Sequence, residues 1–313
     1  MSTPPRVAAI VLNYNGRELT LLSLGSLARI PHPGLTLVHV DNGSTDGSTE
    51  AVAAAFPQVH QIRTEPNLGI SGGLNLGIRW ALAAGFDWLM LLNNDIEADP
   101  QLVAELLAVA ERDPRIGCVG PKTFYYADRA RLWSAGGRLR FREAVTSERG
   151  MGELDRGRWD RDEEVAYVNG CCMLIRREAM VATGLWDPVY HVGVEDADWC
   201  VRMRRAGFTC WYAHRARLWH MVSPSVGGYT PGRTFRTARS TAIFVRKYAN
   251  PLQWASFLAW SAVALPAAYL RELPRRNTAA VTAKLRGLLA GLREPLPPLP
   301  ELTAAEKRGP AAA

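Results

Sequence analysis

The sequence has few cysteines, and their spacing suits neither a disulfide framework nor a zinc site. The five cysteines are an odd number, two of them are neighbours, and none forms a CxxC pair (Cys118, Cys171, Cys172, Cys200, Cys210). A reducing cytoplasm is therefore the predicted compartment. The N-terminal apolar run is too short for a signal peptide, because Asn13 interrupts it, so no signal for export is expected.

Basic runs interleaved with aromatic residues are also absent, which argues against nucleic acid as a partner. The formal net charge is nevertheless +7, and Arg and Lys concentrate after residue 129 and again at 271–293. Because the second group borders an apolar segment, this charge favours an anionic membrane surface as the partner.

The apolar segment, 252–270, contains no charged residue. A bilayer span needs about 20 apolar residues, and Gln253, two serines and Pro266 dilute this one, so a span is not favoured. Aromatic side chains near arginines are typical of a helix that lies on a membrane surface, here the cytoplasmic face. Packing of this helix on the rest of the chain, or on a second subunit of a homodimer, is the alternative.

Short apolar runs alternate with amphipathic helical windows over the first 120 residues. The predicted strands are 7–14, 35–41, 60–64, 88–95 and 116–120, and the predicted helices are 17–29, 46–55, 71–84 and 99–112. This alternation predicts an α/β fold with a mostly parallel sheet and helices on both faces. Ligands of such sheets bind at the carboxyl ends of the strands.

The rest of the chain has weaker patterns. Residues 121–165 have little periodicity and are expected to run over the surface, whereas 165–180, 195–206 and 208–220 predict further strands and helices. The Gly, Pro and Ser residues of 223–233 predict a mobile loop. We therefore divide the chain into an α/β domain at 1–250, a helical extension at 251–295 and a disordered Pro-rich tail at 296–313.

Two polar clusters follow predicted strands. In VDNGSTDGS (40–48), Asp41 could accept hydrogen bonds from a ligand, although an Asx turn with Asp46 as a helix cap explains the same residues. In LLNNDI (91–96), Asn93 and Asp95 share one face of a strand, where their oxygens could meet a divalent cation and a diphosphate. A turn rich in Asn and Asp is the alternative there.

Two further clusters lie near the end of the α/β pattern. Glu195, Asp196 and Asp198 occur at a predicted helix start between two tryptophans, which suits a helix cap or a general base whose basicity is raised by apolar neighbours. His220 ends an apolar strand, as a buried structural histidine or as a metal ligand.

Taken in order, these clusters resemble the family 2 inverting glycosyltransferases of the GT-A fold, and in particular the bacterial rhamnosyltransferase-like branch. The resemblance covers about residues 6–250. Its motifs are AIVLNYNG (9–16), VDNGSTDGS (40–48), NLGISGGLNLGI (67–78), LLNNDI (91–96), VNGCCMLIRRE (168–178), WDPVYHVGVEDADWCVRMRRAG (186–207), WH (219–220) and RSTAIFVRKY (239–248).

The resemblance implies a binding site for a nucleotide-sugar donor. Asn13 and Tyr14 would line the nucleobase pocket, Asp41 would bind the base or ribose, and Asn75 would lie near the sugar nucleotide. Val168 to Cys172 would line the donor sugar and the acceptor. We also expect the loop 223–233 to close over the diphosphate, with Arg233 contacting it.

The resemblance also implies a metal and a base. Asp95 and His220 would bind a divalent cation, Mn²⁺ or Mg²⁺, and Asp196 would be the catalytic base with Glu195 nearby. Many relatives carry aspartate where this chain has Asn93 and Asn94, and Ser240 replaces an asparagine that often follows the arginine. These departures would change metal preference or single contacts of the site.

The predicted reaction is the inverting transfer of a sugar from dTDP-rhamnose or a UDP-sugar to a glycan or a lipid-linked acceptor, in cell-surface polysaccharide synthesis. A sugar nucleotidyltransferase is an alternative, but a Gly-rich basic loop is expected after its first strand, where this chain has NYNGRE. A non-catalytic sugar-nucleotide-binding scaffold would be expected to lose Asp95 or Asp196, and both are present.

Overall fold

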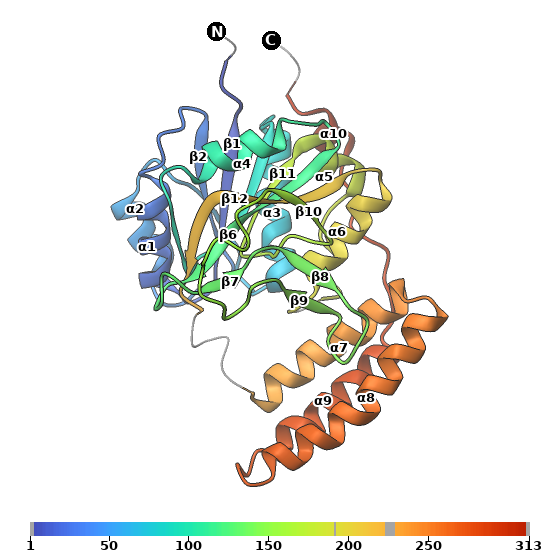
Figure 1. Cartoon of the computed structure of the whole chain (residues 1–313). Coiled ribbons are helices and arrows are strands. Elements are labelled where there is room, and N and C mark those ends of the chain that lie inside the picture. Colours follow the sequence, from blue (N-terminus) through green and yellow to red (C-terminus); the bar gives the residue numbers. More distant parts are fainter. Residues whose placement is uncertain (1–2, 191, 223–228, 311–313) are drawn as a thin grey trace.

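The structure is a computed structural model that describes residues 3–190, 192–222 and 229–310. A ten-stranded sheet lies at the centre of this part of the chain, with helices on both of its faces (Figure 1). Three helices from the C-terminal third, α7, α8 and α9, pack together at one end of the molecule. The predicted α/β fold with a C-terminal helical extension is therefore confirmed.

Six strands of the central sheet run in the same direction, and β11 runs antiparallel between two of them, β4 and β6. The order is β10-β12-β6-β11-β4-β1-β2-β3, with β5 and β7 paired to β12 and β6. The strands are β1 (Val7–Asn13), β2 (Leu35–Asp41), β3 (His60–Arg63), β4 (Trp88–Asn93), β5 (Ile96–Ala98), β6 (Ile116–Tyr125), β7 (Leu132–Ser134), β10 (Glu163–Val165), β11 (Cys172–Arg176) and β12 (Thr209–His220).

Helices cover both faces of the sheet, which explains why its strands are apolar throughout. The helices α1 (Arg17–Leu27), α2 (Ser48–Ala55) and α4 (Leu102–Ala110) cover one face, and α3 (Gly69–Ala83), α5 (Arg177–Thr183), α6 (Glu195–Arg205) and α7 (Pro231–Tyr248) cover the other. Along β1, Ala8 and Ile10 point into one core and Val7, Ala9 and Val11 point into the other. Alternate residues of a strand face opposite sides, so both sets must be apolar.

Residues 121–165 are structured, and the prediction of a surface excursion is wrong for much of this segment. It contributes β7, β10 and the two-stranded sheet of β8 (Gly137–Leu139) and β9 (Thr146–Glu148). Lys122 is buried but pairs with Asp155 at 2.9 Å and with Asp160. Strands of three residues are too short to show a hydrophobic period. A segment that is rich in charged residues also resembles a solvent-exposed one in sequence, even where ion pairs allow its charges to be buried.

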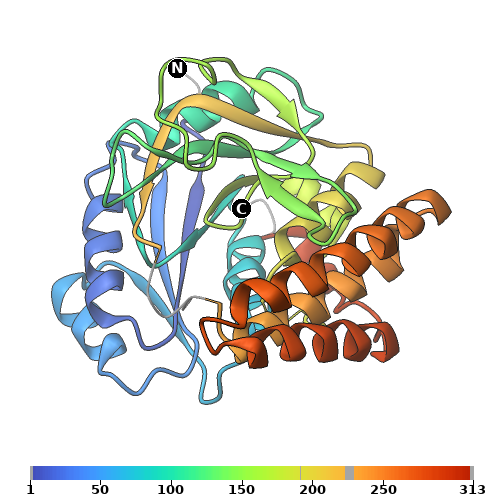
Figure 2. The ribbon, with the colours of Figure 1, turned by 60° about the horizontal axis from the view of Figure 1, so that its bottom comes forward.

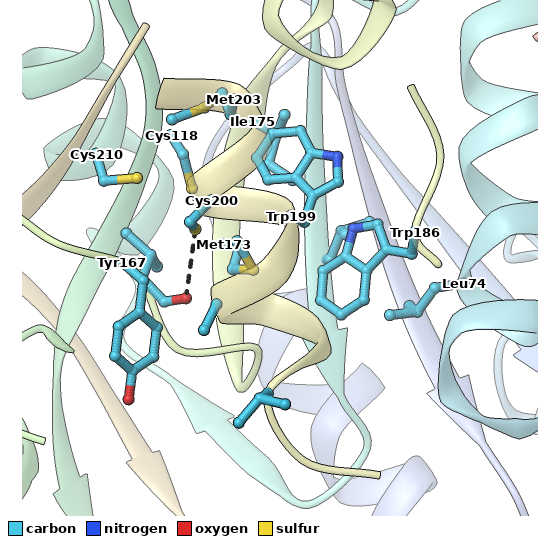
Figure 3. Close-up of a cluster of buried hydrophobic side chains, with 14 of the residues drawn as sticks. Leu74, Cys118, Tyr167, Met173, Ile175, Trp186, Trp199, Cys200, Met203 and Cys210 are labelled. Carbon is cyan, nitrogen blue, oxygen red and sulfur yellow. Dashed lines mark hydrogen bonds between the residues drawn. The ribbon is translucent and has the colours of Figure 1, made fainter. Parts of the chain in front are cut away.

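The helix α6 packs on the sheet through aromatic and sulfur-bearing side chains (Figure 3). Trp199, Cys200 and Met203 are fully buried and face residues of β6, β11 and β12, among them Cys118, Met173, Ile175 and Cys210. The Cys200 Sγ lies 3.9 Å from the backbone oxygen of Val168. All five cysteines are free and buried, in agreement with the sequence prediction that excluded a disulfide framework.

The helical extension consists of α8 (Pro251–Glu272) and α9 (Thr278–Arg293), and α9 packs closely on α7. A Cβ atom at Gly287 would lie 2.2 Å from the backbone oxygen of Phe235, and one at Gly291 would lie 2.3 Å from that of Arg239. Only glycine allows the two helix backbones to approach so closely. Across residues 3–190, 192–222 and 229–310, none of the helices combines the length and apolarity needed to cross a bilayer.

The end of the chain differs from the expected disordered tail. Residues 294–310 run back to the α/β domain, and the short helix α10 (Ala304–Arg308) lies against α3 (Figure 1). Glu306 pairs with Arg79 at 2.7 Å, and Thr303 caps α10. These polar contacts and the burial of Leu302 order a segment whose proline content suggests disorder.

We predict that Trp199→Ala lowers the free energy of unfolding by about 3–5 kcal/mol, because it leaves a large cavity between α6 and the sheet. Urea unfolding followed by circular dichroism measures this loss. The matched control is Trp260→Ala, whose side chain is 44% exposed and whose removal should cost less than about 1 kcal/mol. Equal losses for the two variants would contradict the role given to α6.

Candidate active site

A cavity of about 320 Å³ lies at the carboxyl ends of β1 and β4, where several predicted site residues meet. The start of α6, the end of β12 and the strand β9 form its other walls. The residues that line it and carry polar atoms or bulky rings are Asn93, Trp133, Thr146, Glu148, Tyr167, Asn169, Trp186, Glu195, Asp196 and His220. The ends of parallel strands are where a sheet of this kind binds ligands.

Asp196 faces this cavity from the first turn of α6. The backbone N–H groups of Gly170 and Ala197 donate hydrogen bonds to its two carboxylate oxygens, at 2.8 and 2.7 Å. Burial raises the pKa of Asp196 well above its ordinary value, and the neighbouring carboxyl of Glu195 raises it further. A carboxylate with a raised pKa is a stronger base, so this side chain suits the removal of a proton.

Glu195 is more deeply buried than Asp196 and shares the same cavity wall. Burial raises the pKa of Glu195 to about 7. Its Oε2 is buried without a hydrogen-bond partner among the described residues. An unpartnered carboxylate oxygen beside a cavity is costly unless it is protonated or meets a ligand, so this atom is available to a bound molecule.

Asp198 points away from the cavity, although it belongs to the same acidic cluster in the sequence. It pairs with Arg202 at 2.9 Å and with Lys247, and Tyr248 donates a hydrogen bond to it at 2.6 Å. Burial alone would raise the pKa of Asp198, but these cations outweigh burial and lower it. Asp198 therefore anchors α6 to α7 and takes no part in the cavity.

The turn before α6 has an unusual backbone. Gly193 and Val194 both adopt the left-handed region, at φ +82° and +68°. A branched residue such as Val rarely adopts this conformation, and holding it there costs of order 1–3 kcal/mol. The turn directs Glu195 and Asp196 toward the cavity, so the strain is located where the functional side chains are positioned.

His220 lines the same cavity as this acidic turn, and its Nε2 lies 3.1 Å from Oδ1 of Asp95. Both side chains are buried, and Nδ1 of His220 has no hydrogen-bond partner among the described residues. No group of three or more His, Cys, Asp or Glu side chains suited to a metal occurs in the described part of the chain. An imidazole and a carboxylate nevertheless form a donor pair that fits Mn²⁺ or Mg²⁺ when a diphosphate and water supply the other ligands.

Asn13, Asp41 and Asn94 form a hydrogen-bonded cluster next to the cavity and do not line it. Asn94 donates to Oδ1 of Asn13 at 2.9 Å, and Asn13 donates to the hydroxyl of Ser44 at 3.3 Å. Asp41 accepts hydrogen bonds from the backbone of Ser44 and from the hydroxyl of Thr49. Burial alone would raise the pKa of Asp41, but these hydrogen bonds lower it, so the carboxylate is ionised and holds the Asx turn.

The remaining predicted donor-binding residues lie in different surroundings. Tyr14 is 52% exposed beside this cluster, and Asn93 lines the cavity. Asn75 makes two hydrogen bonds of 2.9 Å to the backbone of Trp186 and so fixes a residue of the cavity wall.

Arg233 lies in the first turn of α7, so the prediction that it belongs to a loop is wrong. Pro231 fits the first turn of a helix, which is why the helix begins inside the predicted loop. Arg233 lines a second cavity. Residues 223–228 of the predicted loop lie outside the described residues.

Sequence reasoning missed the contribution of the β8–β9 region to the cavity. Glu148 accepts hydrogen bonds from Tyr167, from Asn169 at 3.1 Å and from Ser134. Its charge also contributes to the raised pKa of Asp196. The alternation of Thr146 and Glu148 in a three-residue strand was the only local signal, and it is too short to predict this placement.

Residues 4–240 match the model of the protein family described as "Glycosyltransferase like family 2". The chain is 27% identical over 267 residues to the N-acetylglucosaminyl-diphospho-decaprenol L-rhamnosyltransferase of Mycobacterium tuberculosis, covering 74% of this chain and 82% of the relative. It is also 34% identical over 116 residues to the undecaprenyl-phosphate mannosyltransferase of Micrococcus luteus, covering 36% of this chain and 47% of that relative.

Two solved structures share the fold. The mannosyltransferase of Pyrobaculum calidifontis, in complex with GDP-Man and Mn²⁺, has a TM-score of 0.58 at 19% identity and covers 93% of this chain and 88% of its own. GalNAc-T7 with UDP, GalNAc and Mn²⁺ has a TM-score of 0.60 at 16% identity, over 78% of this chain. The match covers about half of the GalNAc-T7 chain (48% of its length). These likenesses confirm the expected GT-A architecture.

We predict that Glu195→Gln stabilises the protein increasingly as the pH rises. The pKa of Glu195 is about 7 when folded and near 4.5 ordinarily, so the unfolded chain loses this proton first. Wild-type stability therefore falls between pH 4.5 and 7, by up to about 3 kcal/mol, and glutamine removes this loss. Denaturant unfolding of both proteins at pH 5 and pH 8 measures the difference.

The control for this prediction is Glu178→Gln, which replaces an exposed glutamate of α5 and should leave a difference that does not vary with pH. A pH-independent difference for Glu195→Gln as well would contradict the raised pKa of Glu195.

Proposed function

The chain belongs to glycosyltransferase family 2, and we propose that it transfers a sugar from a nucleoside diphosphate to an acceptor hydroxyl with inversion at the anomeric carbon. The observation that carries this proposal is that Asp196 and His220 line one cavity at the carboxyl ends of the strands. A base for the acceptor and a donor atom for a metal at the leaving diphosphate are both needed, and the cavity holds both.

In this reaction Asp196 accepts the proton of the acceptor hydroxyl. The hydroxyl oxygen forms a bond to the anomeric carbon while the bond from that carbon to the diphosphate oxygen breaks. The electron pair of the broken bond leaves with the nucleoside diphosphate. The hydrogen bonds from Gly170 and Ala197 orient the carboxylate for this role, because each of its oxygens is held by one backbone N–H group.

Asp95 and His220 would hold a divalent cation, Mn²⁺ or Mg²⁺. When bound, such a cation offsets the negative charge that develops on the leaving diphosphate. Asn93 lines the cavity and offers a neutral amide there. The pair therefore brings a single negative charge, that of Asp95, to the metal.

We propose that Asn13, Tyr14 and Asp41 bind the nucleoside of the donor and that Asn75 positions Trp186 against the sugar. Ser44 and Thr49 hold the carboxylate of Asp41 in place, and an ionised carboxylate can accept further hydrogen bonds from a base or a ribose. Ser240 donates a hydrogen bond to the backbone oxygen of Val192 at 3.0 Å in the cavity wall.

A rhamnosyl donor such as dTDP-rhamnose is the donor that we propose, with UDP-sugars as the alternative. The similarity to the mycobacterial rhamnosyltransferase supports this choice. The name of this mycobacterial relative includes a lipid diphosphate, decaprenol diphosphate, and that of the Micrococcus relative includes a lipid phosphate, undecaprenyl phosphate. We therefore propose a lipid-linked acceptor in cell-surface polysaccharide synthesis. The protein would then act at the cytoplasmic face of the membrane, as a peripheral protein.

We predict that Asp196→Asn lowers kcat for sugar transfer by about 10²- to 10⁴-fold, because the amide cannot accept the proton. The affinity for nucleoside diphosphate should change by less than about threefold, since the side chain keeps its shape. Initial rates of nucleoside diphosphate release measure the first effect, and calorimetric titration measures the second. The control Glu178→Gln, which replaces an exposed side chain of α5, should retain wild-type rates.

The rate of the wild-type protein should also rise with pH, because only the ionised form of Asp196 is a base and its pKa is raised. A wild-type kcat in the Asp196→Asn variant would exclude Asp196 as the base.

We predict that Asp95→Asn raises the Mn²⁺ concentration required for half-maximal nucleoside diphosphate binding by at least about tenfold, because it removes the carboxylate that lies 3.1 Å from His220. Thermal shift of the protein over a series of Mn²⁺ concentrations, with and without EDTA, measures this dependence. Asp113→Asn serves as the control, because its carboxylate pairs with Arg115 at the protein surface. An unchanged Mn²⁺ requirement in Asp95→Asn would place the metal elsewhere.

A further inference from the structure

A second cavity, of about 380 Å³, lies between α7, α9 and the turn that joins β8 and β9. It is lined by Glu143, Ala144, Tyr229, Arg233, Thr234, Thr237, Ala238, Thr241, Lys284 and Leu288. The proposed catalytic mechanism does not use this cavity. Asp196 and His220 line the active cavity, and Asp95 lies beside His220.

The charged groups around this cavity are predominantly basic. Arg233 and Lys284 line it, and the guanidinium of Arg271 lies 5.2 Å from the ring of Tyr229 at its edge. Arg271 also pairs with Glu272 at 2.8 Å, so Arg233 and Lys284 carry the positive charge of the lining. Glu143 is the one acidic residue in the lining, and its Oε2 is buried without a hydrogen-bond partner among the described residues. Burial lowers the pKa of Lys284, Glu143 opposes this effect and Arg271 adds to it.

The hydroxyl of Tyr229 is buried and has no hydrogen-bond partner within the described ranges. It can therefore donate to a bound molecule, and the excess of cationic groups makes an anion the favoured ligand. A phosphate group offers several acceptor oxygens to such donors.

The two cavities share a wall. Val192 and Gly193 line the active cavity, and Thr237 and Thr241 line the second one. A Cβ atom on Gly193 would lie 3.2 Å from Cγ2 of Thr237, so the two linings are in contact there. The β8–β9 turn also reaches both, with Ala144 in the second cavity and Thr146 in the active one. The two cavities therefore lie next to each other, with this wall between them.

An uncharged helix face borders the second cavity. Figure 2 shows α8 and α9 alongside α7 at one side of the α/β domain. Phe257 and Ser261 of α8 are buried, whereas its opposite side exposes large apolar side chains (Leu252, Leu258, Val263, Tyr269, Leu270). Trp260 of the same helix lies 4.6 Å from the guanidinium of Arg142, the neighbour of Glu143. The apolar face of α8 thus leads to the basic cavity.

We propose that the second cavity binds the phosphate groups of a lipid-linked acceptor, whose hydrocarbon chain lies along α8 and whose sugar enters the active cavity. The inference rests on the proposed function, because it assigns the acceptor of that reaction. An apolar helix face, a basic cavity and a catalytic cavity in this order match the order of lipid, phosphate and sugar in such an acceptor. A free phosphate would use the cavity alone and gain nothing from α8.

The test measures binding of three probes to the full chain by calorimetric titration, with the active cavity first saturated by Mn²⁺ and a nucleoside diphosphate. The probes are farnesyl diphosphate, inorganic pyrophosphate and farnesol. Farnesyl diphosphate should bind at least about tenfold more tightly than either other probe, because only it engages both the basic cavity and the apolar helix. Lys284→Gln should weaken its binding about tenfold, and Lys284→Arg should largely restore it.

The matched control is Lys307→Gln, which removes an exposed lysine of α10 and should leave all three affinities unchanged. Equal affinity for pyrophosphate and farnesyl diphosphate would overturn the lipid assignment, and unchanged farnesyl diphosphate binding in Lys284→Gln would overturn the site. Nucleoside diphosphate binding, measured separately, tests the proposed function itself. Its retention in Lys284→Gln also shows that the variant is folded.

Discussion

The packing of α6 against the central sheet is the constraint on which the active cavity depends. Trp199, Cys200 and Met203 are fully buried on the sheet side of this helix, and Asp198 ties it to α7 through Lys247. Because these contacts fix the helix, its first residues must face the strand ends. A carboxylate at that position is desolvated without being paired to a cation, which is the condition for a base of raised pKa.

Surroundings, not residue type, separate the functional carboxylates from the structural ones. Burial and neighbouring acidic groups raise the pKa of Glu195 and Asp196 by more than the backbone hydrogen bonds to these carboxyls lower it. Asp198 and Asp41 are also buried, but cations or hydrogen bonds lower their pKa. The first pair can therefore exchange a proton with a substrate, whereas the second pair is held as anions that fix a helix and a turn.

Much of the fold and part of the site could be predicted from the sequence. The strand and helix alternation of the first 120 residues is strong. Asp95, which follows β4, and His220, which ends β12, do meet in space. The role of Glu148 could not be predicted, because strands of three residues have no measurable period. Arg233 was assigned to a loop from its Gly and Pro neighbours, whereas Pro231 begins a helix. Local composition also could not reveal that Arg79, more than two hundred residues away, pairs with Glu306 and orders the tail.

The central claim is that a single carboxylate drives one displacement at the anomeric carbon. Proton NMR of the anomeric signal during transfer from dTDP-rhamnose or a UDP-sugar, begun before the product can equilibrate, tests it most directly. A product of inverted configuration is the predicted result. Retained configuration would contradict the account, because it requires a second displacement and an enzyme nucleophile in addition to the base.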